Sequence, residues 1–476
     1  MRQLPAAILF VLIAASVAHG QTASAADQAP ASAQPAQPQP AGGLNPTQEI
    51  ARETPEGPAL NAGPTEVRIS GYLGVTGIYR STNAGGGTGT SFGSIPYADT
   101  GEGHLSEARL SAQSSRLSIR VNAAPAAGHP TLAGYFEMDF NGATSGSTAV
   151  TSNGVGFRLR HAFGVTQYRG KYAVAGGQAF SLMTPARDQL SIWPSEYEMS
   201  HAVDVNYVAG LVWARQPQVR FTYRPSAAFN WAISVENPEQ QIGNGLVRLP
   251  SCCTDDLAAQ FNTGDDGLAV PNLMPDIVSR AAFNSGGLHL DAGGVFRVFR
   301  DSVKPYADSF TRAGGGASVN GRFRYASAGQ AIGQTSYGAG MGRYIGGLVP
   351  DVSISADGAI HPIRTASWVA GLEQRLGPST SIALYDSGVA ADTSYSFDPD
   401  GTFIGFGYPG SPNADNRRIH EITGMFAWQA WQIEGRGSMQ WNTQVSWLRR
   451  SPWSQGSGPA SASALLFFTQ IRYNLP

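Results

Sequence analysis

Apolar and polar residues alternate along short stretches of this chain, so that each stretch has two chemically different faces. Between residues 218 and 224 the apolar face carries Val219, Phe221 and Tyr223. The opposite face of the same stretch is polar and carries Gln218, Arg220, Thr222 and Arg224. A period of two residues is that of a β-strand. Such stretches recur from about residue 66 to the last residue and predict an all-β protein.

The alternation predicts sixteen strands. Their approximate ranges are 66–80, 105–123, 131–142, 154–169, 170–181, 217–224, 227–236, 276–285, 287–300, 314–326, 334–346, 365–375, 378–387, 417–428, 430–449 and 462–475.

The connections between these strands alternate in length. Short ones follow the even-numbered strands, at Arg169-Gly170, Pro225-Ser226, Ser285-Gly286, Gly377-Pro378 and Gln429-Ala430. Long ones mostly follow the odd-numbered strands, at 81–104, 182–216, 237–275, 346–364 and 388–416. All tight turns then lie at one end, as in bacterial outer-membrane barrels. We therefore predict a 16-stranded antiparallel up-and-down transmembrane β-barrel over residues 66–476.

The apolar faces of the predicted strands suit contact with lipid. In the first strand Val67, Ile69 and Leu73 share one face, and Arg68 and Ser70 share the other. Tryptophans near predicted strand ends, namely Trp428, Trp431 and Trp447, suit the aromatic girdle of a membrane barrel or ordinary packing.

The first residues have the pattern of a secretory signal peptide. Arg2 supplies the positive end, residues 6–18 the apolar core, and residues 18–20 a cleavage site of small residues. We assign 1–20 to the signal peptide and 21–65, rich in Pro, Ala and Gln, to a flexible periplasmic leader. The expected location is the bacterial outer membrane, reached through the periplasm.

The composition excludes some classes of function. The 476 residues carry a formal net charge of −2, so no overall basic field attracts nucleic acid, and we expect no nucleic-acid partner. The 58 glycines and the low charged fraction of 14% are unlike those of a helical enzyme.

The chain has two cysteines, Cys252 and Cys253, which are adjacent. In an oxidising compartment they are either a vicinal disulfide or free thiols, and we favour a disulfide that staples a surface loop. The neighbouring Asp255 and Asp256 do not by themselves make a metal site. We expect neither a metal nor a cofactor.

Three segments match enzyme motifs but lack the necessary context. Residues 89–93 match the nucleophile elbow, yet no strand-to-helix turn surrounds them. Residues 405–410 match the dinucleotide fingerprint, but Pro409 stands where a helix would open. His420-Glu421 begins like a zinc-protease helix, and Gly424 replaces the second histidine. We therefore expect no enzyme.

The alternation places four pairs of arginines on inward faces: Arg116 with Arg120, Arg158 with Arg160, Arg220 with Arg224, and Arg322 with Arg324. An arginine facing lipid costs about 2–4 kcal/mol at the bilayer midplane, so the inward orientation is preferred. Arginines along a narrow passage attract carboxylates and phosphates. Alternatively they pair with the inward Glu137 and Asp139 and brace the wall. Because arginines outnumber acids in the early strands, we favour an anion preference.

The long connection 182–216 combines charged and aromatic residues. We interpret it as a loop that folds inward and constricts the passage, or alternatively as an exposed cap over the mouth. The candidate constriction residues are Arg187, Asp188, Glu196 and Glu198.

Four segments, 115–121, 134–140, 158–164 and 176–183, resemble the DcaP-like porins. The resemblance is clearest over about 66–185. It implies a homotrimeric, sixteen-stranded outer-membrane porin that takes up small, often anionic, organic solutes. Two features depart from the family pattern: the Pro-rich leader cannot form the N-terminal coiled coil, and the chain ends in Pro476 instead of an aromatic residue.

The expected function is passive diffusion of small hydrophilic, mainly anionic, solutes through a water-filled barrel. The expected partners are the lipid and lipopolysaccharide of the outer membrane, further copies of the chain, and the solutes. Two alternatives belong to other classes: an outer-membrane barrel hydrolase, and a secreted adhesive or carbohydrate-binding β-protein.

Overall fold

The computed structural model describes residues 59–85, 87–123, 129–143, 155–243, 245–263, 270–303, 309–412, 414–433, 435–455 and 458–476. The predicted signal peptide 1–20 and most of the leader 21–65 lie outside the described residues. The end of the predicted leader does not: β1 (Ala59–Ala62) pairs with the start of β2 (Thr65–Arg80). The described sheet therefore begins seven residues before position 66, where we placed the start of the barrel.

The elements follow one another along the chain with few helices. After β1 and β2 come η2 (Glu102–His104), β3 (Glu107–Ser111), β4 (Arg116–Ala123), β5 (Thr131–Asp139), β6 (Arg158–Tyr168), β7 (Tyr172–Phe180), η3 (Pro194–Glu196), β8 (Arg215–Tyr223), β9 (Phe229–Glu236), α3 (Thr254–Ala258), β10 (Asp276–Ser285) and β11 (Leu288–Ser302). Then follow β12 (Ser309–Ala326), β13 (Gly329–Ala339), η5 (Gly342–Tyr344), β14 (Val352–Ile354), β15 (Ile360–Pro362), β16 (Arg364–Arg375), β17 (Thr380–Ala391), β18 (Ser394–Phe397), β19 (Phe403–Phe406), β20 (Asn416–Ile433), β21 (Gly437–Pro452) and β22 (Ala462–Asn474). No helix in the described ranges is long and apolar enough to span a bilayer.

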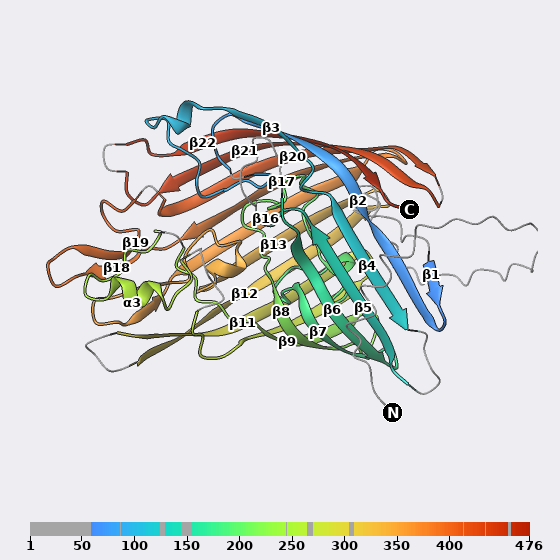
Figure 1. The fold of residues 1–476 in the computed structure, drawn as a ribbon, viewed down its shortest axis with the longest axis horizontal. Coiled ribbons are helices and arrows are strands. Elements are labelled where there is room, and N and C mark those ends of the chain that lie inside the picture. The colour runs from blue at the N-terminus through green and yellow to red at the C-terminus, as the bar shows by residue number, and fades with distance from the viewer. Residues whose placement is uncertain are drawn as a thin grey trace, which may run out of the picture. The chain divides into compact units, whose positions relative to one another are not determined.

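The strands form a closed antiparallel barrel (Figure 1). Each wall strand pairs with the next along the chain, and β22 closes the wall by pairing with β2, from Tyr72 opposite Asn474 to Arg80 opposite Leu466. Strands β3 and β4 both pair with β2, at different heights, and so form one interrupted wall strand. Within the described residues the wall thus has sixteen strands, which confirms the predicted fold class.

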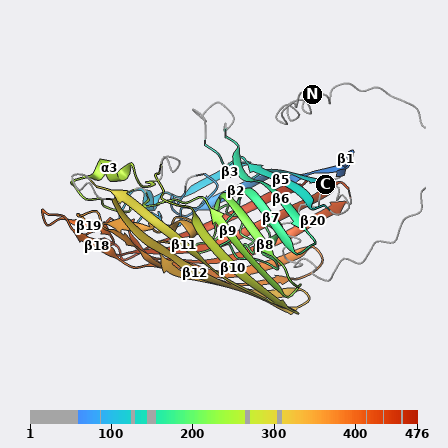
Figure 2. The ribbon, with the colours of Figure 1, turned by 90° about the horizontal axis from the view of Figure 1, so that it is seen from below.

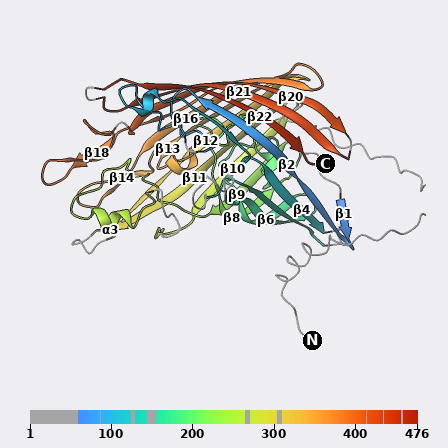
Figure 3. The ribbon, with the colours of Figure 1, turned by 45° about the horizontal axis from the view of Figure 1, so that its top comes forward.

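The two ends of the barrel differ as the connection lengths predict. The long connections, with α3 and the hairpin β18–β19, lie at one end, and the tight turns lie at the other (Figures 1 and 2). A third view shows the same strands crossing the wall obliquely (Figure 3). In the turn between β6 and β7, Arg169 and Gly170 have φ of 52° and 65°, as the two central residues of a type I′ turn require.

Two predicted boundaries are wrong. The turn predicted at Gln429-Ala430 is a register shift inside continuous strand pairing, and the real turn follows Ile433. The extra residue of this bulge interrupts the two-residue alternation of polar and apolar positions. In the sequence such an interruption looks the same as the end of a strand. The strand predicted at 334–346 runs from Gly329 to Ala339, because Gly340, with φ of 80°, takes the chain out of the wall.

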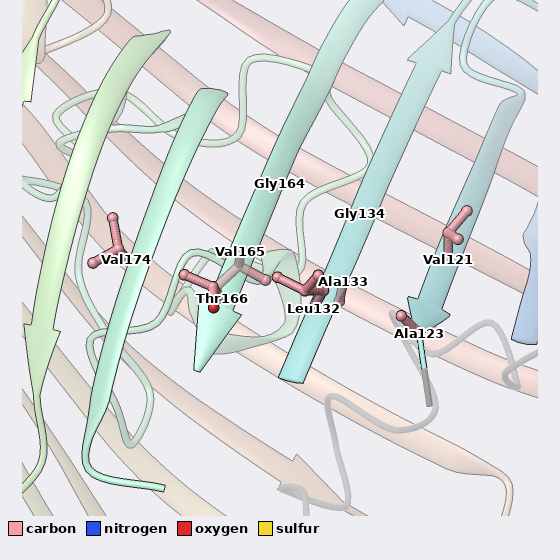
Figure 4. A pocket seen from close by; sticks show the side chains of 9 residues that line it. All are labelled: Val121, Ala123, Leu132, Ala133, Gly134, Gly164, Val165, Thr166 and Val174. Carbon is pink, nitrogen blue, oxygen red and sulfur yellow. The ribbon is translucent and has the colours of Figure 1, made fainter. Parts of the chain in front are cut away.

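The outer face of β4–β7 carries an apolar depression of about 400 Å³ (Figure 4). It exists because Gly134 of β5 pairs with Gly164 of β6, which in turn pairs with Gly176 of β7. These positions leave the outward surface without side chains, between Leu132 and Val174. An apolar outer face suits lipid and offers nothing to a polar solute.

The long connections pack together inside one end of the barrel. One apolar cluster joins Leu257 and Phe261 of the connection 237–275 with Val349 of the connection 340–363, and packs them on Phe299 of β11. A second cluster seats Ile95 of the connection 81–106 on β20–β22. Burial of these side chains holds the loops against the inner wall.

Candidate functional site: the lumen and its inward loop

The connection between β7 and β8, residues 181–214, lies inside the wall. On one side its backbone is held by inward side chains: Arg220 of β8 donates to the carbonyl oxygen of Ser191 at 3.0 Å. Arg280 of β10 donates to the carbonyl oxygen of Met183, also at 3.0 Å. These bonds fix the first half of the loop against β8–β10.

The second half of the loop reaches the opposite wall. The backbone N–H of His201 donates to the hydroxyl of Tyr385 on β17 at 2.9 Å. The backbone N–H of Ala209 donates to the carboxylate of Glu421 on β20 at 2.8 Å. The loop therefore crosses the lumen and divides it.

Little space remains between the loop and the wall of β6–β8. The gap bordered by Ile192 and Trp193 of the loop and by Val165 and Thr222 of the wall has a volume of about 10 Å³. That is roughly the space of one water molecule. On the wall of β4–β6, inward side chains such as those of Arg116 and Arg158 keep about a third of their surface exposed.

A cluster of ion pairs lies on that wall. Arg160 of β6 contacts Glu137 at 2.5 Å and Asp139 at 3.1 Å, and both carboxylates belong to β5. Arg158 contacts Asp139 at 2.6 Å. Arg116 of β4 lies 3.7 Å from Glu137. The side chains of Arg116 and Arg158 are each 31% exposed, so this cluster borders the lumen.

A β-bulge in β6 shapes this cluster. Glu137 pairs with His161 and Met138 with Leu159, so Arg160 is the additional residue of the bulge. Arg160 and His161 are consequently both buried on the inner side of the wall. Bulges re-aim side chains in this way near functional sites.

A fourth arginine joins the cluster from β8. The positive charge of Arg215 is close enough to those of Arg158 and Arg160 to be repelled by both. Its guanidinium sits 5.6 Å from the ring centres of both Phe180 and Trp213. Among the described residues no carboxylate lies within ion-pair distance of Arg215. In this cluster three guanidinium groups share two carboxylates, and Arg215 adds a fourth positive charge.

The inward loop places Tyr207 near this cluster. The side chain of Tyr207 is close enough to Arg116, Arg160 and Arg215 to interact electrostatically with all three guanidinium groups. Its φ of 66° is uncommon for a residue other than glycine. Its ring packs edge-on against Trp213, with ring centres 5.3 Å apart. Strained backbone of this kind is often found at functional positions.

Asp204 joins the inward loop to the connection 81–106. Its carboxylate accepts hydrogen bonds from the backbone N–H of Thr90, at 3.2 and 3.3 Å, and of Asn206, at 2.9 Å. Gln444 of β21 accepts the N–H of Asp204 itself at 2.9 Å. Burial raises the pKa of the Asp204 carboxyl above its usual value. These bonds hold the loop segment next to Tyr207 in place.

The remaining inward arginines differ in their surroundings. Arg120 stacks over Trp193 of the loop at 4.4 Å. Arg220 and Arg322 are only 1% and 3% exposed, because the loop covers them. They face the inner side as the alternation predicts, but they hold the loop and do not line the open passage. Arg224 and Arg324, at the turn ends of β8 and β12, are partly buried.

The loop candidates also have structural partners. Asp188 pairs with Arg322 at 2.5 Å, and Glu198 lies 3.9 Å from the same guanidinium. Arg187 donates to the carbonyl oxygen of Ser195 at 3.2 Å. Burial, reinforced by the charge of Asp188, raises the pKa of the carboxyl of Glu196.

The sulfur atoms of Cys252 and Cys253 are bonded to one another just before α3. Cys253 is buried in the apolar cluster of the long connections. Within the described ranges no group of three or more His, Cys, Asp or Glu side chains is arranged to hold a metal ion.

Sequence reasoning missed Arg215 and Tyr207. Arg215 has the same parity as Val219 and Phe221, which face outward, so alternation alone turns it away from the lumen. In the structure its guanidinium lies over the ring of Phe180, its pairing partner on β7, and that ring is buried in an inner apolar cluster. Tyr207 lies in a loop without periodicity, and no local signal marks it.

No family model matches the chain, and no curated protein matches it. The outer-membrane channel DcaP of Acinetobacter baumannii superimposes with a TM-score of 0.63, at 16% sequence identity, over 88% of this chain and 100% of that chain. This is the fold of an outer-membrane channel. OmpT, an outer-membrane protein of Vibrio cholerae, superimposes with a TM-score of 0.47, at 10% identity, over 88% of this chain and 100% of that one. OprB of Pseudomonas putida gives 0.46, at 11% identity, over 86% and 94%.

Proposed function

We propose that this chain is a passive outer-membrane diffusion channel that prefers small anionic organic solutes and performs no covalent chemistry. The closed wall supports a water-filled passage, because every wall strand has a paired neighbour on both sides. The inward loop supports selection by size, since it crosses the lumen from β8 and β10 to β17 and β20.

One observation carries the anion preference. The guanidinium groups of Arg116, Arg158 and Arg160 share the carboxylates of Glu137 and Asp139, and the nearby Arg215 adds a positive charge without an ion-pair partner among the described residues. The excess positive charge lies in a confined space, where electrostatic attraction is stronger than in bulk water. A carboxylate or phosphate solute gains from this field, and a cation is repelled.

The proposed path of a solute leads past the arginine cluster. Solutes enter between the long connections, pass between Tyr207 of the loop and the arginine cluster, and leave at the end with the tight turns. We further propose a homotrimer, which the resemblance of the four sequence segments implies.

The test is the reversal potential of the full-length protein in a planar bilayer with a salt gradient across it. We expect the sign of an anion-selective channel. The double variant Arg158→Ala plus Arg160→Ala leaves Glu137 and Asp139 without their main partners, so selectivity should move toward cations. Arg364→Ala, an exposed arginine at the start of β16, is the matched control and should leave the potential unchanged.

Two results would overturn the proposal. A native protein without conductance would exclude a channel. Cation selectivity that is the same in the native protein and in the double variant would exclude the arginine cluster as the source of selectivity, while leaving the channel itself in place.

A further inference from the structure

The outer face of β16, β17, β20 and β21 carries a polar group where lipid is expected. These strands lie side by side in the wall (Figure 1). Asp386 of β17 accepts a hydrogen bond from the indole Nε1 of Trp368 at 2.9 Å. Its other carboxylate oxygen lies 2.7 Å from Nε2 of His420 on β20. The outward orientation follows from the exposure of the side chain of Asp386, which is 50%.

Two arginines lie next to this group. His420 pairs directly with Arg449 of β21, and Arg418 lies two residues before His420 on the same face. The guanidinium of Arg418 stacks over Trp368 at 5.2 Å, and Asp386 is within Coulombic range of it. Among the described residues the side chain of Arg449 has no hydrogen bond or ion pair. The surface therefore presents more positive than negative charge.

Hydroxyl groups complete the set of donors. Ser451 of β21 pairs with Arg418, and Ser463 of β22 pairs with Arg449, so both share the outward face with the arginines. We call the five side chains Arg418, His420, Arg449, Ser451 and Ser463 the outer donor patch. All of them can donate hydrogen bonds to an anionic oxygen.

The height of the patch corresponds to the outer boundary of the bilayer. Trp428 and Trp441 are paired and exposed near the end with the tight turns, as expected for the inner girdle. Arg418 lies ten residues before Trp428 in β20, toward the end with the long connections. At about 3.3 Å per residue and a tilt of about 40°, this is about 25 Å, the thickness of the apolar band of such barrels.

The surface below the patch suits hydrocarbon chains. Leu384, Ile422 and Val445 are outward and 54%, 41% and 45% exposed. Trp447 packs edge-on against His420, with ring centres 6.0 Å apart, at the upper limit of this apolar surface. Guanidinium and hydroxyl groups directly above an apolar wall match a phosphate attached to acyl chains.

We propose that the outer donor patch binds the phosphate of a phosphorylated glycolipid in the outer leaflet, that is, of the lipid A part of lipopolysaccharide. Arg418 and Arg449 supply charge-assisted hydrogen bonds to the phosphate oxygens. Asp386 is a positioning residue: its carboxylate is hydrogen-bonded to Trp368 and His420 and so orients both side chains. The proposal does not depend on which solutes pass through the lumen.

The experiment titrates the full-length protein in detergent with bisphosphorylated lipid A and measures bound lipid by native mass spectrometry. A second titration uses the same lipid without its phosphates. The native protein should bind the phosphorylated lipid more tightly. In Arg418→Ala plus Arg449→Ala its affinity should fall about tenfold or more, with no change for the dephosphorylated lipid.

Two further variants separate charge from folding. Arg418→Lys plus Arg449→Lys keeps the charge but loses the planar fork, so it should retain part of the affinity. Arg436→Ala, in the turn at the opposite end of the wall, should bind like the native protein. Retention of the folded electrophoretic mobility before heating shows that each barrel has formed.

Three results would overturn the proposal. The first is unchanged affinity of the double alanine variant for the phosphorylated lipid. The second is equal binding of phosphorylated and dephosphorylated lipid by the native protein. The third is loss of oligomers in the double variant with unchanged lipid affinity, which would assign this face to a contact between subunits.

Discussion

Arg220 and Phe180 are joined by a hydrogen bond of 2.7 Å, from Nη2 to the backbone carbonyl oxygen, where the inward loop leaves β7. Nη1 of the same guanidinium reaches the carbonyl oxygen of Ser191 at 3.0 Å and the hydroxyl of Tyr197 at 3.1 Å. One buried side chain thus ties two points of the loop and the end of β7 to β8. The constriction depends on residues that no solute touches.

Replacing Arg220 by alanine should loosen the loop. Three acceptors lose a charged donor in a buried place, and we expect about 3 kcal/mol of lost stability. Denaturant unfolding of the protein in vesicles measures this loss, and single-channel recordings should show a noisier current. Arg224→Ala, at the partly exposed end of the same strand, is the control and should change stability by no more than about 0.5 kcal/mol.

Arg215 should contribute to selectivity more than to stability. It adds positive charge without a carboxylate partner, so Arg215→Gln removes charge and leaves no unpaired acid. We expect the ratio of anion to cation permeability to fall roughly two- to fivefold at low salt, and by less at high salt because of screening. Reversal potentials at two salt concentrations measure both effects. An unchanged ratio at low salt would show that the field comes from other arginines.

Gly210 should be essential for seating the loop against β17. Its φ is 88°, and a Cβ there would stand 2.2 Å from the carbonyl oxygen of Gly388. Gly210→Ala therefore meets both backbone strain and a collision, and we expect a cost of about 2–3 kcal/mol. Faster proteolysis within residues 181–214 would report the displaced loop.

Gly424→Ala provides the control for this prediction. A Cβ at Gly424 meets nothing within 4 Å, and its φ is not positive. This variant should be digested at the native rate. Equal protection of the loop in both variants would contradict the role assigned to Gly210.

Asp415 should make stability depend on pH. It lies in the connection before β20, where its carboxylate accepts the N–H of Gly407 at 2.7 Å. Burial raises the pKa of its carboxyl to about 7 from the usual 3.8. The folded protein then binds this proton more tightly than the unfolded chain does, so its contribution is complete below about pH 4 and is lost as pH rises through about 7.

The thermal midpoint measured between pH 5 and pH 8 tests this. From pH 8 to pH 5 we expect a gain on the order of 1–3 kcal/mol in the native protein from this group. Asp415→Asn cannot titrate, so its stability should change less over the same range. Parallel curves for the two proteins would assign the dependence to other groups.

Most of the wall could be predicted from the sequence, because each strand's alternation is a local property. The predicted strand near 276–285 coincides with β10, and the turn predicted at Ser285-Gly286 lies one residue further on, at Gly286-Gly287. The prediction failed at the bulge between Gln429 and Trp431, where one additional residue reverses the parity while the strand continues.

The lumen could be predicted only in part. Alternation places Arg220 and Arg322 on the inner side but cannot tell whether a loop covers them. The loop's course depends on contacts such as that of Ala209 with Glu421, 212 residues apart. The course of the loop determines that Arg220 holds the loop against the wall and that Arg116 and Arg158 border the passage.

The sequence by itself determined that the chain forms a sixteen-stranded barrel with loops at one end, an apolar outer face and inward arginines. That information is repeated in every strand as a two-residue period. Only the tertiary structure decided which arginines meet solute, how Arg215 joins Arg160, and that Asp386 and Arg449 belong to one outward surface. Those relationships join strands and loops far apart in the chain, and strand pairing and loop packing bring them together.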